Sequence, residues 1–298
     1  MNLKSAFIGA NGIRAGWRLL IFAAVLVACQ IGIVAALRPL WPSLLALLRA
    51  IQKGPLTAQG LITMEIIYVT SVAVAVTLMS RIERRPIRQY GLPGKGAFGK
   101  RFWEGALWGL SMVAAMILLQ RLEGVFTFGT LALHGTQIGK LGLLWAFGTL
   151  LVGIYEELTF RGYVQFTLAS GIGFWPAAVA SSVIFGVIHM ADLFYDWPGV
   201  ISAALFGLLF CLVLQRTGDL WLAVGFHAAV DFAETYLFAS PTSSSGHLFN
   251  CTLHGSRWLT GGTVGPESSL NGWIVFVIVF WLFGKIHPSK PANTTPAG

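Results

Sequence analysis

Charged residues are scarce in this sequence. Only 11% of its 298 residues are Asp, Glu, Lys or Arg, whereas soluble domains carry roughly 25%. Hydrophobic residues make up 55% of the chain. The length alone would allow two soluble domains, but this composition excludes them and predicts a membrane protein.

Cysteine is also rare. The chain has three cysteines, at Cys29, Cys211 and Cys251. Two lie within apolar runs and the third lies in a polar stretch near the C-terminus, so they do not form a paired framework. We expect no disulfide.

Long apolar runs dominate the chain. Eight of them approach the roughly 17 to 25 residues that a helix needs to cross a bilayer. We therefore predict an all-α fold, a polytopic bundle of about eight transmembrane helices. The runs cover residues 17–37, 60–80, 103–119, 141–158, 174–190, 199–215, 220–238 and 271–286.

Lys and Arg cluster before the first run, between the second and third runs, and after the last. Positive loops stay in the cytoplasm, so eight crossings place all three clusters there, with both termini cytoplasmic in a cell inner membrane. The net charge of +8 then reflects topology. The basic residues flank spans and form no known nucleic-acid module, so we expect no nucleic-acid partner. The clusters are Lys4, Arg14 and Arg18; Arg81, Arg84, Arg85, Arg88, Lys95, Lys100 and Arg101; and Lys285 and Lys290.

These features divide the chain into three regions. Residues 1–102 hold two helices and a basic connector, residues 103–238 form a helical core, and residues 239–298 hold an outer loop, the last helix and a tail predicted to be disordered from Pro288. Most polar residues within apolar runs fall between 156 and 234. We expect the chemistry in the middle region.

Ionisable side chains in the hydrocarbon layer cost at least roughly 2.5 to 3.5 kcal/mol and mark functional or paired sites. We expect Glu104 to pair with Lys100 or Arg101. Glu65 has no neighbour in sequence that assigns it a role, and Glu234 either supports a site or approaches the outer interface. The full set is Glu65, Glu104, Glu156, Glu157, His189, His227, Asp231 and Glu234.

Two pairs within this set have helical spacing. Glu157 and Arg161 are four residues apart, so they share a helix face and form an ion pair that lowers the cost of burial. Glu156 points about 100° away and is left without a structural partner. His227 and Asp231 are also four apart; they either converge on a site or make a structural hydrogen bond.

Glu156, His189, His227 and Asp231 come from three different apolar runs. A bundle interior is the place where their burial costs can be offset together, so we expect them to converge. Such a cluster can activate water by general-base catalysis or by holding a divalent metal. Either route favours hydrolysis.

The depth of His189 conflicts with this expectation. With a rise of 1.5 Å per residue, Glu156 and His227 lie roughly 10 Å from the cytoplasmic boundary, whereas His189 lies roughly 22 Å away. Either the fifth span starts below the interface, in a helix continuing from 163–172, or His189 is not part of the cluster. We favour the first interpretation, with residues 190–197 dipping inward as a protein-buried loop.

The order of these motifs resembles a known family. Glu156-Glu157-x-x-x-Arg161, Phe185-x-x-x-His189 and His227-x-x-x-Asp231 follow one another on successive apolar helices. This arrangement, over roughly residues 140–235, is similar to the CPBP family of intramembrane proteases, which includes type II CAAX prenyl proteases and bacteriocin-processing or self-immunity proteins.

The resemblance implies an eight-helix fold with a cavity open to the cytoplasm. It implies that Glu156 and His189 activate water, that His227 and Asp231 stabilise the oxyanion, and that Glu157 and Arg161 support them. An ionised Asp231 cannot donate a hydrogen bond, so it is protonated, orients His227 or helps to bind a metal.

Metal dependence is open at this point. Glu156, His189 and His227 suit Zn²⁺, but the sequence has no HExxH motif, and a metal-free glutamate mechanism fits equally. The expected activity is an intramembrane endopeptidase acting on a membrane-associated protein or peptide that is lipidated in some relatives. Two alternatives are a non-catalytic membrane regulator or scaffold with the same fold, and a proton-coupled transporter. The transporter is disfavoured because no inverted repeat is visible.

Overall fold

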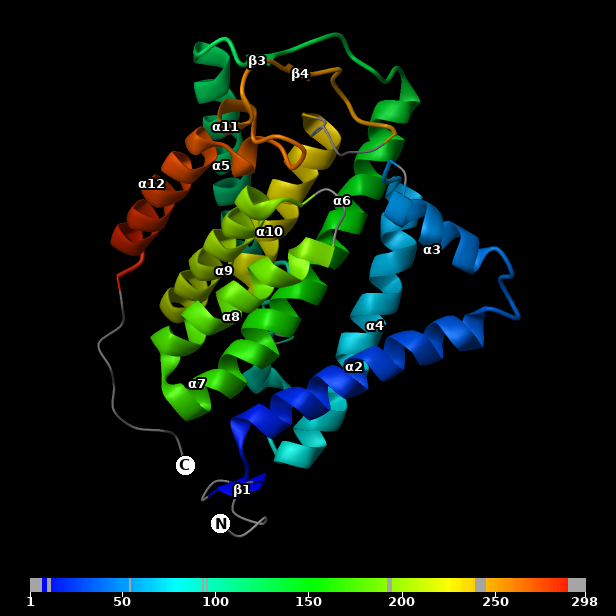
Figure 1. The fold of residues 1–298 in the computed structure, drawn as a ribbon, viewed down its shortest axis with the longest axis vertical. Coiled ribbons are helices and arrows are strands. Elements are labelled where there is room, and N and C mark those ends of the chain that lie inside the picture. The colour runs from blue at the N-terminus through cyan, green and yellow to red at the C-terminus, as the bar shows by residue number, and fades with distance from the viewer. Residues whose placement is uncertain are drawn as a thin grey trace.

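A computed structural model describes residues 7–9, 12–53, 55–92, 94, 96–191, 195–238 and 245–288. Lys4, Lys95, Lys290 and the predicted disordered tail beyond Pro288 lie outside these ranges. The described part is almost entirely helical (Figure 1), which confirms the predicted all-α fold.

All eight predicted runs form helices. Six helical stretches are long and apolar enough to cross a membrane: 15–37, 58–83, 100–122, 136–172, 174–191 and 197–217. The other two runs form helices of 17 residues, 221–237 and 270–286. The protein is therefore a multi-pass membrane protein. The long helices are α2 (Ala15–Leu37), α4 (Ala58–Glu83), α5 (Lys100–Leu122), α6 (Thr136–Glu156), α8 (Phe174–Ile188), α9 (Trp197–Thr217), α10 (Trp221–Phe232) and α12 (Leu270–Ile286).

Short elements connect the long helices. Two are π-helical extensions, η2 (Glu157–Gln165) after α6 and η4 (Ala233–Leu237) after α10. The others are β1 (Ile8–Gly9), β2 (Gly12–Ile13), α3 (Leu44–Lys53), η1 (Ile87–Tyr90), β3 (Phe126–Thr127), α7 (Phe166–Ile172), η3 (His189–Ala191), β4 (Thr252–Leu253), α11 (Arg257–Thr260) and η5 (Pro266–Ser268).

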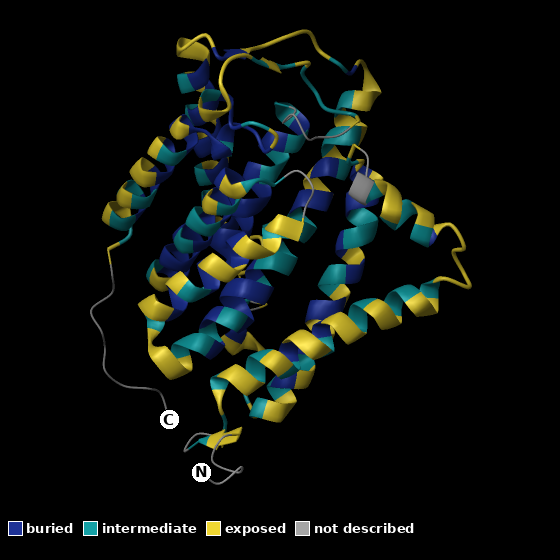
Figure 2. Ribbon diagram, in the orientation of Figure 1, coloured by how far each residue is buried: buried dark blue, intermediate teal, exposed yellow. Residues whose placement is uncertain are grey.

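Helix α10 is the centre of the bundle. Every residue from Trp221 to Val230 is buried, and α5, α6 and α9 pack around it (Figure 2). Glycine permits the close approach to α5: a Cβ added at Gly225 would lie 2.0 Å from the backbone oxygen of Phe102, and one at Gly105 would lie 2.0 Å from that of Leu222. Small residues let membrane helices meet backbone to backbone, so α10 is held at a fixed depth and rotation.

The fourth predicted span, 141–158, is too short. Helices α6, η2 and α7 form one continuous stretch from Thr136 to Ile172, and Gly173, at φ +84°, ends it. Glycine adopts this left-handed conformation without a Cβ clash, so the chain reverses there and α8 packs back against α7 and η2. The predicted helix over 163–172 exists, but it continues span four.

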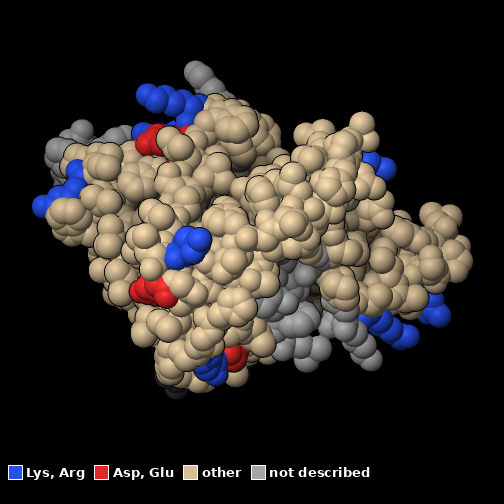
Figure 3. Space-filling view, turned by 90° about the horizontal axis from the view of Figure 1, so that it is seen from above, with Lys and Arg blue, Asp and Glu red and all other residues tan. Residues whose placement is uncertain are grey.

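Two loops pair at the end of the bundle opposite α7. Strand β3 pairs antiparallel with β4, with Phe126 opposite Leu253 and Thr127 opposite Thr252, and a further bridge joins Leu131 to Phe249. Seen from this end, Lys, Arg, Asp and Glu are few and scattered over the coloured surface (Figure 3). The paired loops therefore form a mainly uncharged cap over the helix ends.

Helices α2 and α3 lie at the periphery. Helix α2 crosses the bundle obliquely (Figure 1) and packs on α4 and α7, burying only Phe22 and Leu26. Helix α3, a short helix of apolar and polar residues between the first two spans, is not among the predicted helices.

Candidate active site

Glu157 joins two of the predicted motifs. Its Oε1 accepts hydrogen bonds from Arg161 Nη1 at 3.0 Å and from His227 Nδ1 at 2.9 Å. The side chains of Glu157 and Arg161 are 0% and 1% exposed, so these hydrogen bonds are shielded from water. A buried charged pair is stable only when its hydrogen-bonding groups meet partners in good geometry. The predicted Glu157–Arg161 ion pair is present, and it also fixes the imidazole of His227.

Aromatic rings hold the Arg161 guanidinium from two sides. Its Cζ lies 4.3 Å from the ring centre of Phe185 on α8 and 5.2 Å from that of Phe210 on α9. Phe210 also stacks on His227, with ring centres 5.2 Å apart and planes at 19°. Cations are attracted to aromatic faces, so four helical segments fix the positions of Arg161 and His227 together.

The other imidazole nitrogen of His227 faces two more carboxylates. His227 Nε2 lies 3.5 Å from Glu156 Oε2 and 3.7 Å from Asp231 Oδ2. The predicted 100° separation of Glu156 and Glu157 does not keep Glu156 from His227, because the imidazole lies between the two carboxylates and presents one nitrogen to each. The chain widens into the π-helix η2 at this point, as π-turns often do at functional sites.

The three carboxylates around His227 differ in exposure. The Glu156 and Asp231 side chains are 20% and 28% exposed, whereas Glu157 is fully buried. Glu156 and Asp231 are therefore partly exposed on the Nε2 side of His227, and Glu157 is enclosed on its Nδ1 side.

The hairpin at Gly173 accounts for the depth of His189. Glu156 lies 16 residues before Ile172, and His189 lies 15 residues after Phe174. Counted from Gly173, the two residues are a similar number of residues along segments that pack on each other, as the predicted convergence requires. Part of the predicted inward loop 190–197, residues 192–194, lies outside the described residues.

His189 has a different environment from His227. Its Nδ1 lies 2.7 Å from the Phe185 carbonyl oxygen, which can only accept, so Nδ1 carries the proton and Nε2 is the acceptor in the neutral ring. The rings of Phe185 and Tyr195 lie 4.6 Å and 4.9 Å from the His189 ring. One histidine is thus paired with carbonyl and aromatic groups, and the other with carboxylates.

Tyr195 and Glu267 were missed by the sequence analysis. The Tyr195 hydroxyl donates to Glu267 Oε1 at 3.3 Å. Burial raises the pKa of Tyr195, and the carboxylates of Glu267, Asp231, Glu234 and Glu156 raise it further. Tyr195 therefore contacts the His189 ring and hydrogen-bonds to Glu267. No motif marks these residues, because one follows a short turn and the other belongs to the outer loop.

The remaining ionisable residues have other surroundings. Glu104 pairs with Arg101 at 3.6 Å, as predicted, and also with His287 at 3.0 Å. Glu65 is buried on α4, and its Oε2 accepts no hydrogen bond from the described residues. Glu234 lines a separate cavity at the capped end of the bundle.

The side chains as placed do not form the predicted zinc set. In the part of the chain that the structure describes, no three His, Cys, Asp or Glu residues form a group that could hold a metal ion. His227 Nδ1 is bonded to Glu157, and its Nε2 faces carboxylates 3.5 Å and 3.7 Å away. Glu156, His189 and His227 are therefore not grouped as metal ligands in this arrangement, and a metalloendopeptidase is not supported.

The motifs and their helical setting agree with a family comparison. Residues 138–233 match the family model described as type II CAAX prenyl endopeptidase Rce1-like. This stretch is similar to an Rce1-like domain. It lies within the predicted 103–238 core and includes Glu156, Glu157, Arg161, His189, His227 and Asp231. The match confirms the resemblance to CAAX-type intramembrane proteases, and it covers about a third of the chain. No curated protein matches the sequence.

Proposed function

We propose that this protein is an intramembrane endopeptidase that hydrolyses a peptide bond in a membrane-associated or lipidated protein or peptide. The observation that carries the proposal is the unequal setting of the two histidines. His189 presents an acceptor nitrogen, whereas His227 donates from Nδ1 to Glu157 and turns Nε2 toward Glu156 and Asp231. One ring suits water activation and the other suits hydrogen-bond donation.

In the proposed reaction, Glu156 takes a proton from water while His189 Nε2 orients that water. The water oxygen attacks the carbonyl carbon of the scissile bond, and the carbonyl electrons move to its oxygen. General bases of this kind contribute 10²- to 10⁴-fold. The oxyanion electrons then re-form the C=O bond as the C–N bond breaks, and Glu156 returns the proton to the departing amine, giving a carboxylic acid and an amine, and the acid then loses its proton to water.

His227 and Asp231 serve the oxyanion in this scheme. His227 protonated on both nitrogens donates Nδ1–H to Glu157 and offers Nε2–H to the substrate oxygen, and the surrounding carboxylates stabilise the cation. Asp231, 3.7 Å from Nε2, orients the ring from the substrate side. In this scheme an ionised Asp231 assists the oxyanion through His227, because it cannot donate a hydrogen bond itself.

The proposed chemistry uses no resident metal. We therefore expect activity in 1,10-phenanthroline to stay within about twofold of the untreated enzyme, and added Zn²⁺ not to raise it. A loss of activity with the chelator, restored by Zn²⁺, would replace the metal-free scheme with a metal-dependent one.

The proposed location is a cell inner membrane with both termini cytoplasmic. The support comes from the placement of Lys and Arg in the sequence. A cysteine-free variant carrying one new cysteine at the 81–102 connector tests this, because a membrane-impermeant thiol reagent should label it only after the cells are opened.

The direct test of activity uses the full-length protein in lipid nanodiscs. Wild type, Glu156→Gln and the control Glu104→Gln are incubated with fluorogenic peptides, each prepared with and without a lipid group. We expect cleavage by wild type and Glu104→Gln, and a fall of about 10³-fold for Glu156→Gln. Equal cleavage by wild type and Glu156→Gln would refute the assignment. A partner-dependent phenotype that survives alanine at Glu156, His189 and His227 would favour the regulator instead.

A further inference from the structure

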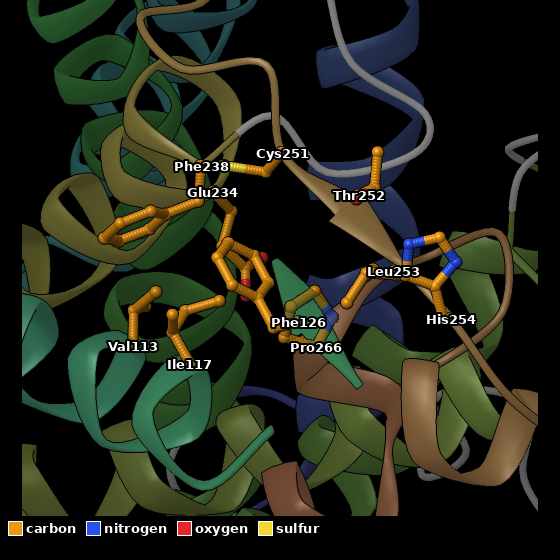
Figure 4. Close-up of a pocket in the computed structure, with 10 residues that line it drawn as sticks. All are labelled: Val113, Ile117, Phe126, Glu234, Phe238, Cys251, Thr252, Leu253, His254 and Pro266. Carbon is orange, nitrogen blue, oxygen red and sulfur yellow. The ribbon is translucent and has the colours of Figure 1, made fainter. Parts of the chain in front are cut away.

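A cavity lies beneath the paired loops, and none of the proposed catalytic residues lines it. It encloses about 300 Å³, at the lower end of the range for small-molecule sites. Helix α5, strands β3 and β4 and the end of η4 contribute its walls (Figure 4). Thr252 and His254 on its β4 side are exposed, so the cavity is reached from the capped end of the bundle.

Glu234 is the one carboxyl among the side chains that line this cavity. The residue is 9% exposed, and its Oε1 is buried without a hydrogen-bond partner among the described residues. A buried carboxylate is costly unless a donor or a cation meets it. Glu234 therefore brings to the wall of this cavity a carboxyl whose hydrogen bonds the described residues do not all supply.

Aromatic rings lie beside this carboxyl. Phe126 and Phe238 both line the cavity, with ring centres 6.2 Å apart and planes at 85°. The negative faces of aromatic rings attract ammonium groups, and a carboxylate offers them a charge-assisted hydrogen bond. The other walls are mainly aliphatic, which suits an apolar body.

We propose that this cavity binds a small primary amine carried on an apolar group, with the ammonium donating to Glu234. Glu234 lies just beyond the stretch that matches the family model, which ends at residue 233. The proposed peptidase reaction does not use Glu234, although its carboxyl is one of those that raise the pKa of Tyr195.

A native cysteine reports on occupancy. Cys251 lines the cavity and is partly exposed, whereas Cys211 is 0% exposed. In a Cys29→Ser background, Cys251 is the thiol expected to react with methyl methanethiosulfonate. Burial raises the pKa of the Cys251 thiol, so the labelling at pH 8 should be slow enough to follow by intact mass.

The test compares 2-phenylethylamine with its neutral analogue 2-phenylethanol on the full-length protein in nanodiscs. We expect the amine to slow labelling of Cys251 at least tenfold more than the alcohol at equal concentration. Glu234→Gln should abolish this difference, and Glu104→Gln should preserve it. An unchanged labelling rate of Glu234→Gln without ligand shows that its cavity is intact.

The proposal is overturned if the two compounds slow labelling equally, if neither slows it, or if the advantage of the amine survives Glu234→Gln. The comparison of the two compounds on the Cys29→Ser protein decides the matter even if the Glu234→Gln protein does not fold.

Discussion

Helices α10 and α2 are both strongly apolar, yet their surroundings are opposite. In α10 every residue from Trp221 to Val230 is buried, whereas α2 buries only Phe22 and Leu26. Close helix contact makes the difference: Gly225 on α10 meets the backbone of Phe102, while a Cβ at Gly32 on α2 would have no atom within 4 Å. The comparison teaches that hydropathy places a helix in the membrane but does not tell whether protein or lipid surrounds it.

The largest expected effect is a loss of stability when the close contact between α10 and α5 is disrupted. The Cβ that Gly225→Ala adds would lie 2.0 Å from the Phe102 backbone oxygen. This distance is too short for two atoms that are not bonded, so α5 and α10 must move apart. We expect a loss of about 3 kcal/mol or more in unfolding free energy. The matched change Gly32→Ala should be neutral or slightly stabilising. Thermal unfolding followed by Trp fluorescence measures both, and equal shifts would contradict the packing argument.

The next effect sharpens the contrast between buried and exposed carboxyls. Glu157→Gln removes the charge shared by Arg161 and His227, so His227 loses its fixed orientation. We expect kcat to fall about 100-fold, which is about 2.7 kcal/mol in the barrier, with KM within about threefold. Glu104→Gln, whose side chain is 26% exposed, is the control. Unchanged kcat in Glu157→Gln would mean that Glu157 has only a structural role.

A smaller effect is expected at the edge of the cluster. Tyr195→Phe keeps the ring contact with His189 but removes the hydroxyl that donates to Glu267. We expect peptidase kcat to fall about three- to tenfold, because one neutral hydrogen bond is worth about 1 kcal/mol. Tyr195→Leu should lower kcat further. If Tyr195→Phe has wild-type kinetics, the hydroxyl does not help to position His189.

The smallest expected effect is on how the stability of the fold changes with pH. Burial raises the pKa of Glu267 above its ordinary value of 4.5, although His189 and the Tyr195 hydroxyl oppose this shift. The folded protein thus holds this proton more tightly than the unfolded chain, so the contribution of Glu267 to stability is full below pH 4.5 and is lost as pH rises through the raised pKa.

Glu267→Gln should therefore unfold at a higher temperature than wild type at pH 8, and this advantage should shrink as the pH falls toward 4.5. The unfolding temperatures of both proteins are measured from pH 4.5 to pH 8, with Glu104→Gln as the control. An advantage that is constant with pH would show that the carboxyl charge is not its cause.

Local sequence patterns predicted the long helices of this protein and two of its side-chain pairs. Eight apolar runs gave eight helices, and four-residue spacing gave the Glu157–Arg161 pair and the His227–Asp231 approach. Both follow from backbone geometry within a single segment, since residues four apart share a helix face. The same reasoning could not show that the fourth helix runs on to Ile172, because residues 159–172 mix polar and apolar side chains and hydropathy gives no stop signal.

Contacts between distant segments were not predictable in this way. Glu157 and His227 are 70 residues apart, and Tyr195 and Glu267 are 72 apart. Their meeting depends on how α6, α8 and α10 are rotated and how the outer loop folds back. Glu267 lies in a polar loop. A carboxyl in a polar segment is not expected to be buried, so the sequence does not mark Glu267 as a site residue.

The sequence by itself determined that this chain lies in a membrane, which segments are helical, and which few polar groups need partners there. Only the tertiary structure decided that Glu157 accepts a hydrogen bond from Nδ1 of His227 while Glu156 and Asp231 face Nε2. It also placed Glu234, whose Oε1 has no partner among the described residues, at the wall of a cavity. The physical reason is range: hydropathy and helical spacing act within a segment, whereas hydrogen bonds require atoms from different helices to come within about 3 Å.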